Sequence, residues 1–375
     1  MTTVAALGVA LAVPLFSAGP ADAHGSGRLY VAPNGAARNS DTSCRHAQYT
    51  DIQAAIEDAR PGGTVVVCRG VYATSVTVDR RITLAGMPGA VIDATGAPYG
   101  VGITASWSTV RGLTVVNASG DNPDFPYDGI ITAGFTAEGP APADHVMIIN
   151  NRVHGNKGSG IDLNSTSHSI ARGNIATENG VGINVADDLG APAANNVIAE
   201  NVTNRNFGGC GIALADHTGA GVVGNLVTGN ISDDNGLATP TAPDASAGSG
   251  VILASPIPGG TVKNNVISYN EFHGNGHGGV VVHSHVPNIP DGPMNDFTGN
   301  QVIGNLIGTN NLRTDEADLE TTGIYLGSAS PLQITVRGNW ISDNHFGIFT
   351  AGDVTVTGSN TYTNVDVQMD GVSSF

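Results

Sequence analysis

Aspartate and histidine side chains recur in the middle of the chain beside short apolar segments, where they could carry out acid–base chemistry. Asp162 lies within one segment, Asp187 and Asp188 follow the next, and Asp216 with His217 follows the one after. If these segments lie side by side, neighbouring members are about 5–10 Å apart. Carboxyl groups at such a separation can act as general acid and general base across a glycosidic bond, and a histidine can transfer a proton near neutral pH. We therefore predict a catalytic group of Asp187, Asp188, Asp216, His217 and His283.

Two other interpretations of these aspartates stay open. Carboxylate oxygens are the usual ligands of Ca²⁺, so Asp162, Asp187 and Asp216 are also predicted as a calcium site. In addition, Asp187, Asp188 and Asp216 open turns, where aspartate is common for purely structural reasons.

Further side chains near this group are predicted to contact a substrate. His283 and His285 are alternate residues of one strand and therefore share a face. Lys157 and Arg205 are the basic pair of this region, and an elimination reaction needs a base as well as a cation beside the substrate carboxylate. The predicted substrate-binding residues are Asp162, Asn184, Tyr325, Lys157, Arg205 and His285.

Regularly spaced asparagines indicate the elements that must position these side chains. Successive units each carry an Asn-x4-Asn pair, at 151/156, 174/179, 201/206, 225/230, 265/270, 300/305 and 339/344. Each unit continues with glycine, a β-branched residue, an outward position and an apolar residue. Repeats of such short strands are typical of a solenoid. We predict an all-β fold, a single right-handed parallel β-helix with about three strands per coil and about 4.8 Å between stacked strands.

The asparagines are expected at the corners between strands. Asparagine tolerates the left-handed backbone region better than most residues, and stacked amides can bond to one another along a column. Aligning the units on their glycine step predicts one inward column, made of Ile130, Ile161, Ile183, Ile212, Val251, Val280, Ile324 and Ile348. Long loops precede this strand at 118–128, 236–249 and 310–322 and follow it at 133–144, 187–195 and 286–296, which predicts a groove between two walls of loops.

The ends of the chain suggest a secreted protein with a capped solenoid. An apolar run at 4–16 followed by Ala21-Asp22-Ala23 is typical of a signal peptide covering residues 1–23. Residues 24–63 are predicted to form an N-terminal strand and a capping helix at 51–60, residues 64–365 the β-helix, and residues 366–375 a C-terminal tail or cap. An oxidising compartment fits a disulfide between Cys44 and Cys68, with Cys210 as a small buried residue.

Charge excludes two classes of partner. The formal net charge is −17, and only 15 of the 375 residues are lysine or arginine. A nucleic-acid partner would need a basic footprint, and docking on an anionic membrane would need basic clusters. We therefore expect neither, and we expect a polysaccharide or oligosaccharide as the partner.

Several stretches resemble the secreted right-handed β-helix proteins of the pectate-lyase-like superfamily. They are LYVAPNG (29–35), YTDIQAAIEDARPGGTVVVCRGVY (49–72), ITLAGMPGAVIDATG (82–96) and the coils described above. The resemblance covers nearly the whole mature chain and implies the fold. That superfamily includes polysaccharide lyases, glycosidases, epimerases, phage adhesins and a periplasmic protein of copper-enzyme maturation, so fold analogy alone does not choose a function.

Three functions are therefore weighed. The first is a secreted carbohydrate-active enzyme, a polysaccharide lyase or glycoside hydrolase, that acts on an extended glycan along the groove, with Ca²⁺ as a potential cofactor. The second is a non-catalytic glycan-binding or surface-adhesion β-helix, and the third is a periplasmic-type metal-handling protein. The polygalacturonase pattern of an aspartate pair followed by Gly-His-Gly fits poorly, because Asp187-Asp188 and Asp233-Asp234 lie one or more coils from Gly276-His277-Gly278.

Overall fold

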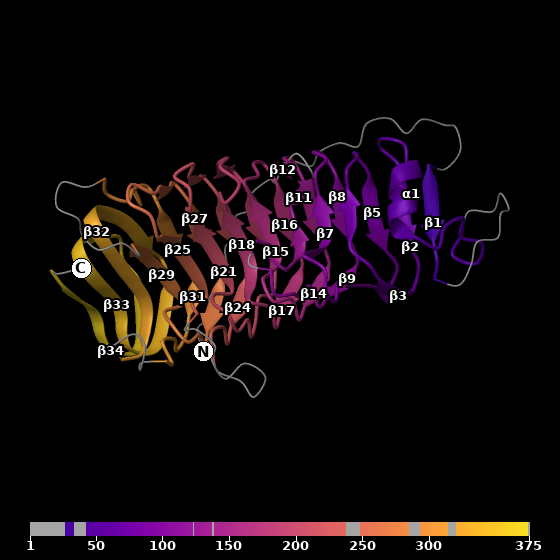
Figure 1. The fold of residues 1–375 in the computed structure, drawn as a ribbon. Coiled ribbons are helices and arrows are strands. Elements are labelled where there is room, and N and C mark those ends of the chain that lie inside the picture. The colour runs from indigo at the N-terminus through magenta and orange to yellow at the C-terminus, as the bar shows by residue number, and fades with distance from the viewer. Residues whose placement is uncertain are drawn as a thin grey trace.

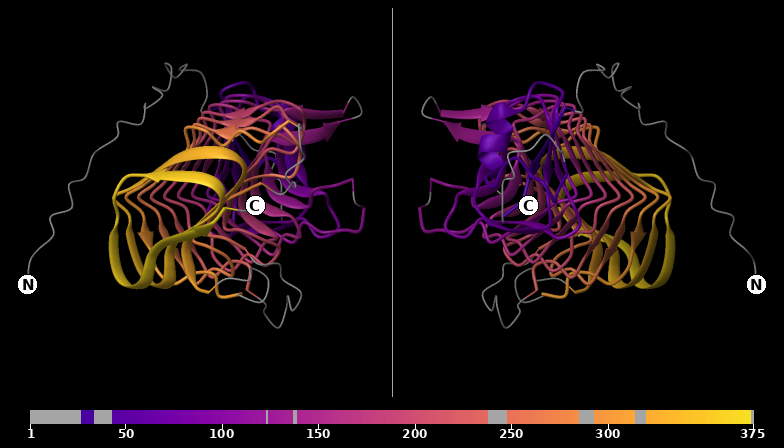
Figure 2. Two further views of the ribbon diagram at one scale, coloured as in Figure 1. Left: turned by 90° about the vertical axis from the view of Figure 1, so that its left-hand side faces the viewer. Right: turned by 90° about the vertical axis from the view of Figure 1, so that its right-hand side faces the viewer.

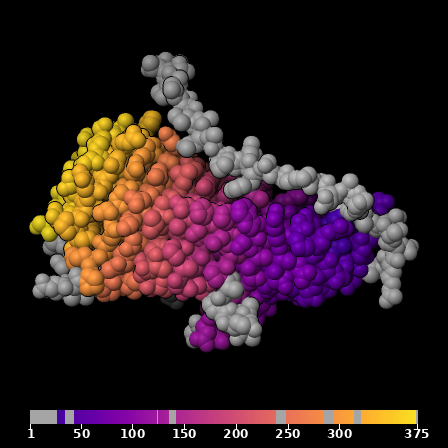
Figure 3. Space-filling model, turned by 90° about the horizontal axis from the view of Figure 1, so that it is seen from above, coloured from indigo at the N-terminus to yellow at the C-terminus, as the bar shows by residue number. Residues whose placement is uncertain are grey.

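The computed structural model is an elongated stack of coils that follow one another in sequence order (Figure 1). It describes residues 27–33, 43–122, 124–136, 139–237, 248–284, 293–313 and 320–373. The predicted signal peptide and His285 lie outside these ranges. The colours of the space-filling view run along the body in sequence order, so segments distant in number become neighbours along the axis (Figure 3). In the end-on views, the coils superpose on one another (Figure 2).

Three parallel sheets form the sides of the stack, which confirms the prediction of about three strands per coil. The groove sheet carries the predicted site and consists of β4 (Val76–Val78), β7 (Tyr99–Ile103), β10 (Asp128–Ile131), β15 (Ser159–Asn164), β18 (Val181–Ala186), β21 (Ile212–Ala215), β25 (Val251–Ser255), β29 (Val280–Ser284) and parts of β32 (Thr322–Arg337) and β33 (Trp340–Thr357).

The second sheet starts at the N-terminal strand. It consists of β1 (Arg28–Val31), β2 (Thr64–Val67), β5 (Thr83–Gly86), β8 (Thr109–Arg111), β13 (Met147–Ile149), β16 (Ile170–Arg172), β20 (Val197–Ala199), β23 (Leu226–Thr228), β27 (Val266–Ser268), β30 (Gln301–Ile303) and the later parts of β32 and β33.

The third sheet closes each coil. It consists of β3 (Gly70–Ala73), β6 (Ala90–Asp93), β9 (Thr114–Val116), β14 (Arg152–His154), β17 (Ile175–Thr177), β24 (Ile231–Asp233), β28 (Glu271–His273), β31 (Leu306–Ile307), the start of β33 and β34 (Thr361–Val372). Short strands β19 (Ala193–Ala194), β22 (Val222–Val223) and β26 (Val262–Lys263) pair at one corner, and β11 (Ala133–Thr136) with β12 (Gly139–Pro142) forms an antiparallel hairpin.

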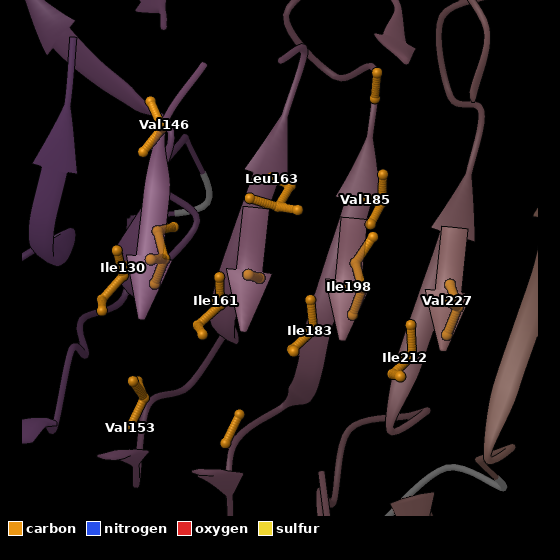
Figure 4. Packing of buried hydrophobic residues seen from close by; sticks show 14 of the residues in the cluster. Ile130, Val146, Val153, Ile161, Leu163, Ile183, Val185, Ile198, Ile212 and Val227 are labelled. Atoms are coloured by element: carbon orange, nitrogen blue, oxygen red, sulfur yellow. The ribbon is translucent and has the colours of Figure 1, made fainter. Parts of the chain in front are cut away.

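One apolar residue per coil of the groove sheet points into the core, in the predicted register. Ile130 pairs with Ile161, which pairs with Ile183 and then Ile212 (Figure 4). The column continues through Val251, Val280, Ile324 and Ile348, and all its members are buried. The predicted inward column is therefore confirmed. A repeating apolar column suits a stacked fold because each coil buries its side chains against the coils above and below.

Buried asparagines form hydrogen-bonded ladders at all three corners of the coil. In the ladder between the second and third sheets, Asn201 donates its backbone N–H and its Nδ2 to Asn230 Oδ1, each at 2.9 Å. Three ladders run through these residues: 151, 174, 201, 230, 270, 305, 339 and 360; 156, 179, 206, 235, 275, 310 and 344; and 196, 225, 265 and 300. The predicted stacking of amides is confirmed, and the five-residue interval is one strand plus its corner.

The predicted backbone role of these asparagines is wrong. The ladder members do not have positive φ; the residue directly before many of them does. Glu200, with φ 56°, precedes Asn201, and Tyr269, with φ 55°, precedes Asn270. Two consecutive residues therefore form each such corner. The first adopts the left-handed conformation that turns the chain, and the second is the asparagine whose side chain is buried. The alignment of pairs also shifts, since 225/230, 265/270 and 300/305 occupy a different pair of corners from 174/179 and 201/206.

The glycine of each repeat leaves room for the ladder. A Cβ on Gly160 would lie 2.6 Å from Asn179 Nδ2, and one on Gly129 would lie 2.8 Å from Asn156 Nδ2. Both distances are shorter than a tolerable contact. Glycine is therefore required where the groove strand starts, because the amide of a buried asparagine occupies the space of its side chain.

The two ends of the stack differ. Helix α1 (Ile52–Asp58) begins after Asp51, whose side chain accepts the N–H of Ala54, and it buries Ile52, Ala55 and Ile56 against the first strands. The predicted capping helix is thus confirmed. At the other end, residues 361–372 form β34, which pairs in parallel with β33 as the last strand of the stack, so the β-helix extends into the segment predicted as a C-terminal tail or cap at 366–375. No helix among the described residues is long and apolar enough to cross a membrane.

The disulfide ties the first coils together. Cys44 and Cys68 are bonded across a separation of 24 residues, as predicted, and Cys210 is buried and free. A crosslink over a loop of this length is expected to stabilise the fold by about 3 kcal/mol. Dithiothreitol should therefore lower the urea midpoint of wild-type unfolding. The Cys44→Ala/Cys68→Ala variant serves as the control, and an equal shift in that variant would show that the reductant acts elsewhere.

Candidate functional site

The candidate site lies on the outer face of the groove sheet. The residue after each inward isoleucine or valine points outward, and these residues pair in one row. The row runs through Ile131, Asp162, Asn184, Ala213, Ile252, Val281, Tyr325 and Phe349. Asp162 and Asn184 are its polar members, and Tyr325 and Phe349 are aromatic residues at its C-terminal end. The aliphatic Ala213, Ile252 and Val281 lie between these two groups.

Asp162 is the centre of a hydrogen-bonded polar cluster. Its Oδ1 accepts from Asn184 Nδ2 and its Oδ2 from Asn164 Nδ2, each at 3.0 Å. Asn164 Nδ2 also donates to Asp188 Oδ2 at 3.0 Å. Asp162 is 3% exposed, so both of its oxygens are satisfied by amides rather than by solvent. The side-chain amide of Asn164 therefore lies between the carboxyl groups of Asp162 and Asp188.

Asp128 completes the cluster, and the sequence prediction missed it. It begins β10, is 2% exposed, and accepts the backbone N–H of Ser159 on Oδ1 at 2.6 Å. Its Oδ2 is buried and finds no donor among the described residues, while the Asp162 side chain is its neighbour. Two neighbouring buried carboxyl groups favour the protonated form of at least one of them. Asp128 and Asp162 are therefore a coupled pair of buried acids.

Burial raises the pKa of both members of this pair. Loss of solvent raises the pKa of Asp128 to about 7, against the opposing effect of the Ser159 hydrogen bond. Burial, followed by the negative charges of Asp128 and Asp188, raises the pKa of Asp162 well above its ordinary value. Near neutral pH the pair therefore holds a proton, which is the state that a general acid needs.

Asp188 forms the solvent-facing end of the cluster together with His217. His217 Nδ1 and Asp188 Oδ1 lie 2.5 Å apart, and both side chains are more than a third exposed. The hydrogen bond to Asp188 raises the pKa of His217, which favours the imidazolium next to the carboxylate. The cluster thus combines a protonated acid at its buried end with an ion pair at its open end.

A cavity of about 310 Å³ opens over the cluster. Asp128, Asp162, Asn184, Asp188 and Lys157 line it. This volume lies at the lower end of the range for small-ligand sites. Lys157 Nζ donates to the carbonyl of Gly120 at 2.6 Å, lies 3.8 Å from Asp121 and sits 5.2 Å from the centroid of the Tyr127 ring. The lysine therefore supplies a positive charge at the rim.

The proton on the buried pair predicts an alkaline limit to any reaction that uses it. The pKa of Asp128 is raised in the folded protein, so its proton is present below about pH 7 and is lost above it. Activity that needs this proton is expected to fall as the pH rises through about 7, and folding stability should also decrease between pH 4 and pH 7 because the unfolded carboxyl group releases its proton earlier. A kcat/KM profile measures the first effect, and a profile that stays flat to pH 9 would contradict it.

Asp187 and Asp216 have the contacts of turn-forming carboxylates. Asp187 accepts backbone N–H groups from His217, Ala220 and Gly221 at 2.7, 2.9 and 3.1 Å, and Asp216 accepts those of Gly219 and Thr261. Burial opposes ionisation of Asp187, but hydrogen bonds from Asp216, His217 and the following turn bring its pKa below the ordinary value. Burial raises the pKa of Asp216.

These contacts oppose the predicted calcium site of Asp162, Asp187 and Asp216, because they occupy its carboxylate oxygens. The oxygens of Asp187 and Asp216 are directed at the 216–221 turn and at Thr261, and those of Asp162 at two amides. Within the described ranges, no group of three or more His, Cys, Asp or Glu side chains could hold a metal ion. The residues present do not fit the predicted cation, and the mechanism below does not use one.

The remaining predicted residues lie apart from the cluster. Arg205 pairs with Glu178 at 3.4 Å on the corner before the groove sheet and does not line the cavity. His283 lies two coils after Ala215, and its ring is 5.8 Å from that of Tyr325. Tyr325 stacks with Phe349 at 6.4 Å and contacts His277 at 5.6 Å. These side chains form an aromatic surface, which is four coil steps from Asn184, and His285 lies outside the described residues.

Comparisons with known proteins support the fold. Residues 132–255 match the family model of the right-handed β-helix region. No curated protein matches the sequence significantly.

Solved structures similar to this chain include carbohydrate-active enzymes. The A-module of the mannuronan C-5 epimerase AlgE4 from Azotobacter vinelandii is 20% identical with a TM-score of 0.54, over 92% of this chain and 100% of that one. Pectate lyase Pel9A is 17% identical with a TM-score of 0.58, over 89% and 79%. The GH136 lacto-N-biosidase from Eubacterium ramulus is 12% identical with a TM-score of 0.57, over 90% and 68%. At these identities the likeness concerns the fold alone, and the chain is a right-handed parallel β-helix.

Proposed function

We propose that this chain is a glycoside hydrolase that cleaves an extended neutral glycan bound along the groove sheet. One observation carries the proposal: two neighbouring buried carboxyl groups with raised pKa values, Asp128 and Asp162, line the same cavity as Asp188, which is partly exposed and hydrogen-bonded to His217. Acid–base cleavage of a glycosidic bond requires one carboxyl group that donates a proton and a second that accepts one.

In the proposed reaction, the Asp128–Asp162 pair donates its proton to the glycosidic oxygen as the bond from that oxygen to the anomeric carbon breaks. Asp188 takes a proton from the attacking water, whose oxygen bonds to the anomeric carbon. His217 holds Asp188 in place through its hydrogen bond. Asn164 positions both carboxyl groups, because its Nδ2 donates to Asp162 and Asp188.

The aromatic surface supports an extended substrate. Tyr325 and Phe349 belong to the same outward row as Asp162 and Asn184. Four strand spacings separate Asn184 from Tyr325, which is about 19 Å. Several sugar units would span this length, and aromatic rings provide a flat apolar surface for the apolar face of a sugar. Acidic glycans are disfavoured, because Lys157 is the only cationic side chain among the described residues that line the cavity.

Lys157 nevertheless supports a second candidate, β-elimination on a uronic acid polymer. Its ammonium group lines the cavity beside the acids and could neutralise a substrate carboxylate. In that reaction a base removes the proton next to the carboxylate, and the glycosidic bond on the neighbouring carbon breaks to leave a double bond.

A panel of neutral and acidic polysaccharides separates these reactions. Hydrolysis releases new reducing ends from neutral glycans without ultraviolet absorbance, whereas elimination produces an absorbing unsaturated sugar. Binding without either product would favour a non-catalytic, glycan-binding β-helix. We also propose an extracytoplasmic location, which the Cys44–Cys68 disulfide supports.

A further inference from the structure

A second cavity lies on a different side of the stack, over the first strands of the second sheet. It has a volume of about 330 Å³, and its lining includes Arg28, Tyr30, Ser43, Ala85 and Arg111. The groove sheet contributes no residue to it. Its size is in the range of sites for small organic ligands and exceeds what a single inorganic anion needs.

The order of side chains across the sheet explains the cavity. One row runs from Tyr30 through Val66 and Ala85 to Arg111. Large side chains therefore stand at the two ends of the row, with small ones between them. Gly86 adds to the floor, because a Cβ at this position would lie 2.5 Å from the carbonyl oxygen of Gly112. The result is a shallow trough with an arginine at each end.

The disulfide fixes one rim of this trough. Cys44 is a lining residue and is bonded to Cys68, which follows β2. Ser43 precedes Cys44, and its carbonyl accepts the N–H of His46 at 3.0 Å. Tyr30 is held through its backbone, which donates to Gln48 Oε1 at 2.8 Å. The disulfide and these two hydrogen bonds therefore fix the position of the rim in the absence of a ligand.

The polar side chains of the trough can still form hydrogen bonds and ion pairs with a ligand. Arg28 and Arg111 are exposed, and among the described residues neither guanidinium has an acidic partner, unlike Arg172, which pairs with Glu200 at 2.6 Å on the same sheet. The hydroxyl groups of Tyr30 and Ser43 likewise have no partner within the described ranges. Two guanidinium groups that line one cavity and have no acidic partner in the described part of the chain are unusual, because the sequence holds 32 acidic and only 15 basic residues.

We propose that this trough binds a short segment of an acidic glycan, with the carboxylates of its uronic acid units held by Arg28 and Arg111. Guanidinium groups bind carboxylates in a planar, two-point geometry. Arg28 and Arg111 are three strands apart, which is about 14 Å across the sheet. A ligand with carboxylates on successive units meets both ends of the trough, and the Tyr30 and Ser43 hydroxyls bond to its sugar hydroxyls. The site differs in place and in charge from the acid cluster of the groove.

Calorimetric titration of the full chain with trigalacturonate tests this site. We expect wild-type protein to bind it at low ionic strength, and Arg28→Gln or Arg111→Gln to weaken binding about tenfold or more, since each removes hydrogen bonds to a charged group. Both arginines are exposed, so the melting temperature and the activity on neutral glycans should stay unchanged in these variants.

Three controls make the result decisive. Arg172→Gln should leave the affinity for trigalacturonate unchanged, because that guanidinium is already paired with Glu200. An equal loss of affinity in this variant would mean that the arginines act only through the net charge of the protein. Lys157→Gln should also leave it unchanged, and a loss confined to this variant would place the ligand in the groove. Maltotriose should not bind. Failure of wild-type protein to bind trigalacturonate, or binding of inorganic phosphate alone at the two arginines, would overturn the assignment of an acidic glycan.

Discussion

Replacing Asp128 with asparagine is expected to reduce kcat on the glycan substrate by about 10²–10⁴-fold while the protein stays folded. The amide oxygen can still accept the Ser159 N–H, which Asp128 accepts at 2.6 Å. The amide Nδ2 can donate toward Asp162, as the proton of the proposed acid pair would. The variant therefore preserves the hydrogen bonds of the protonated pair but has no proton to give to a leaving group.

The same change should remove the alkaline limb of the pH profile that Asp128 sets. Asp234→Asn is the matched control, because Asp234 is an exposed corner residue with φ 56°, a conformation that asparagine tolerates well. Its activity should equal that of the wild type. If Asp128→Asn retains activity within a few-fold of wild type, the buried pair is not the proton donor. If it loses binding of the glycan together with turnover, its role is structural.

The repeat made the fold predictable in unusual detail. Because stacked coils share one register, aligning a glycine step placed Ile161, Ile183 and Ile212 above one another, and pairing confirms it. The sequence did not predict which corner of the coil each asparagine occupies. Each Asn-x4-Asn pair occupies two of the three corners, and the five-residue interval is the same for any two consecutive corners. Spacing alone therefore could not show that 201/206 and 225/230 occupy different pairs of corners.

The site was predictable where it follows the sheet and not where it depends on turns. Outward positions gave Asp162 and Asn184, which do bond to one another. Asp128 stands at the start of its strand, before the glycine step, and no pattern of alternation assigns it to the outer face. Asp187 resembles Asp188 in sequence, yet the backbone N–H groups of a turn some 30 residues later bind Asp187 and leave Asp188 for His217. The direction of those N–H groups is a property of the folded turn.

Replacing Asn230 with alanine is expected to destabilise the protein by about 3–5 kcal/mol. Asn230 Oδ1 accepts two N–H groups from Asn201, and its Nδ2 donates to the carbonyl of Ile198 and to Asn270 Oδ1, all at 2.9 Å. These partners are buried. Alanine leaves several of them without a bond in a region closed to water, and each unsatisfied buried group costs about 1–3 kcal/mol. Urea unfolding monitored by circular dichroism measures the change.

Asn360 provides the comparison within the same ladder. It accepts the N–H and Nδ2 of Asn339 at 3.0 and 2.8 Å, but it is half-buried and has no following ladder member. Water can replace the lost bonds there, so Asn360→Ala should cost only about 1 kcal/mol. Equal effects at the two positions would mean that the amides contribute through local corner geometry alone. A larger loss at Asn230 would instead show that the ladder stabilises the stack because each amide satisfies the coil before it and the coil after it.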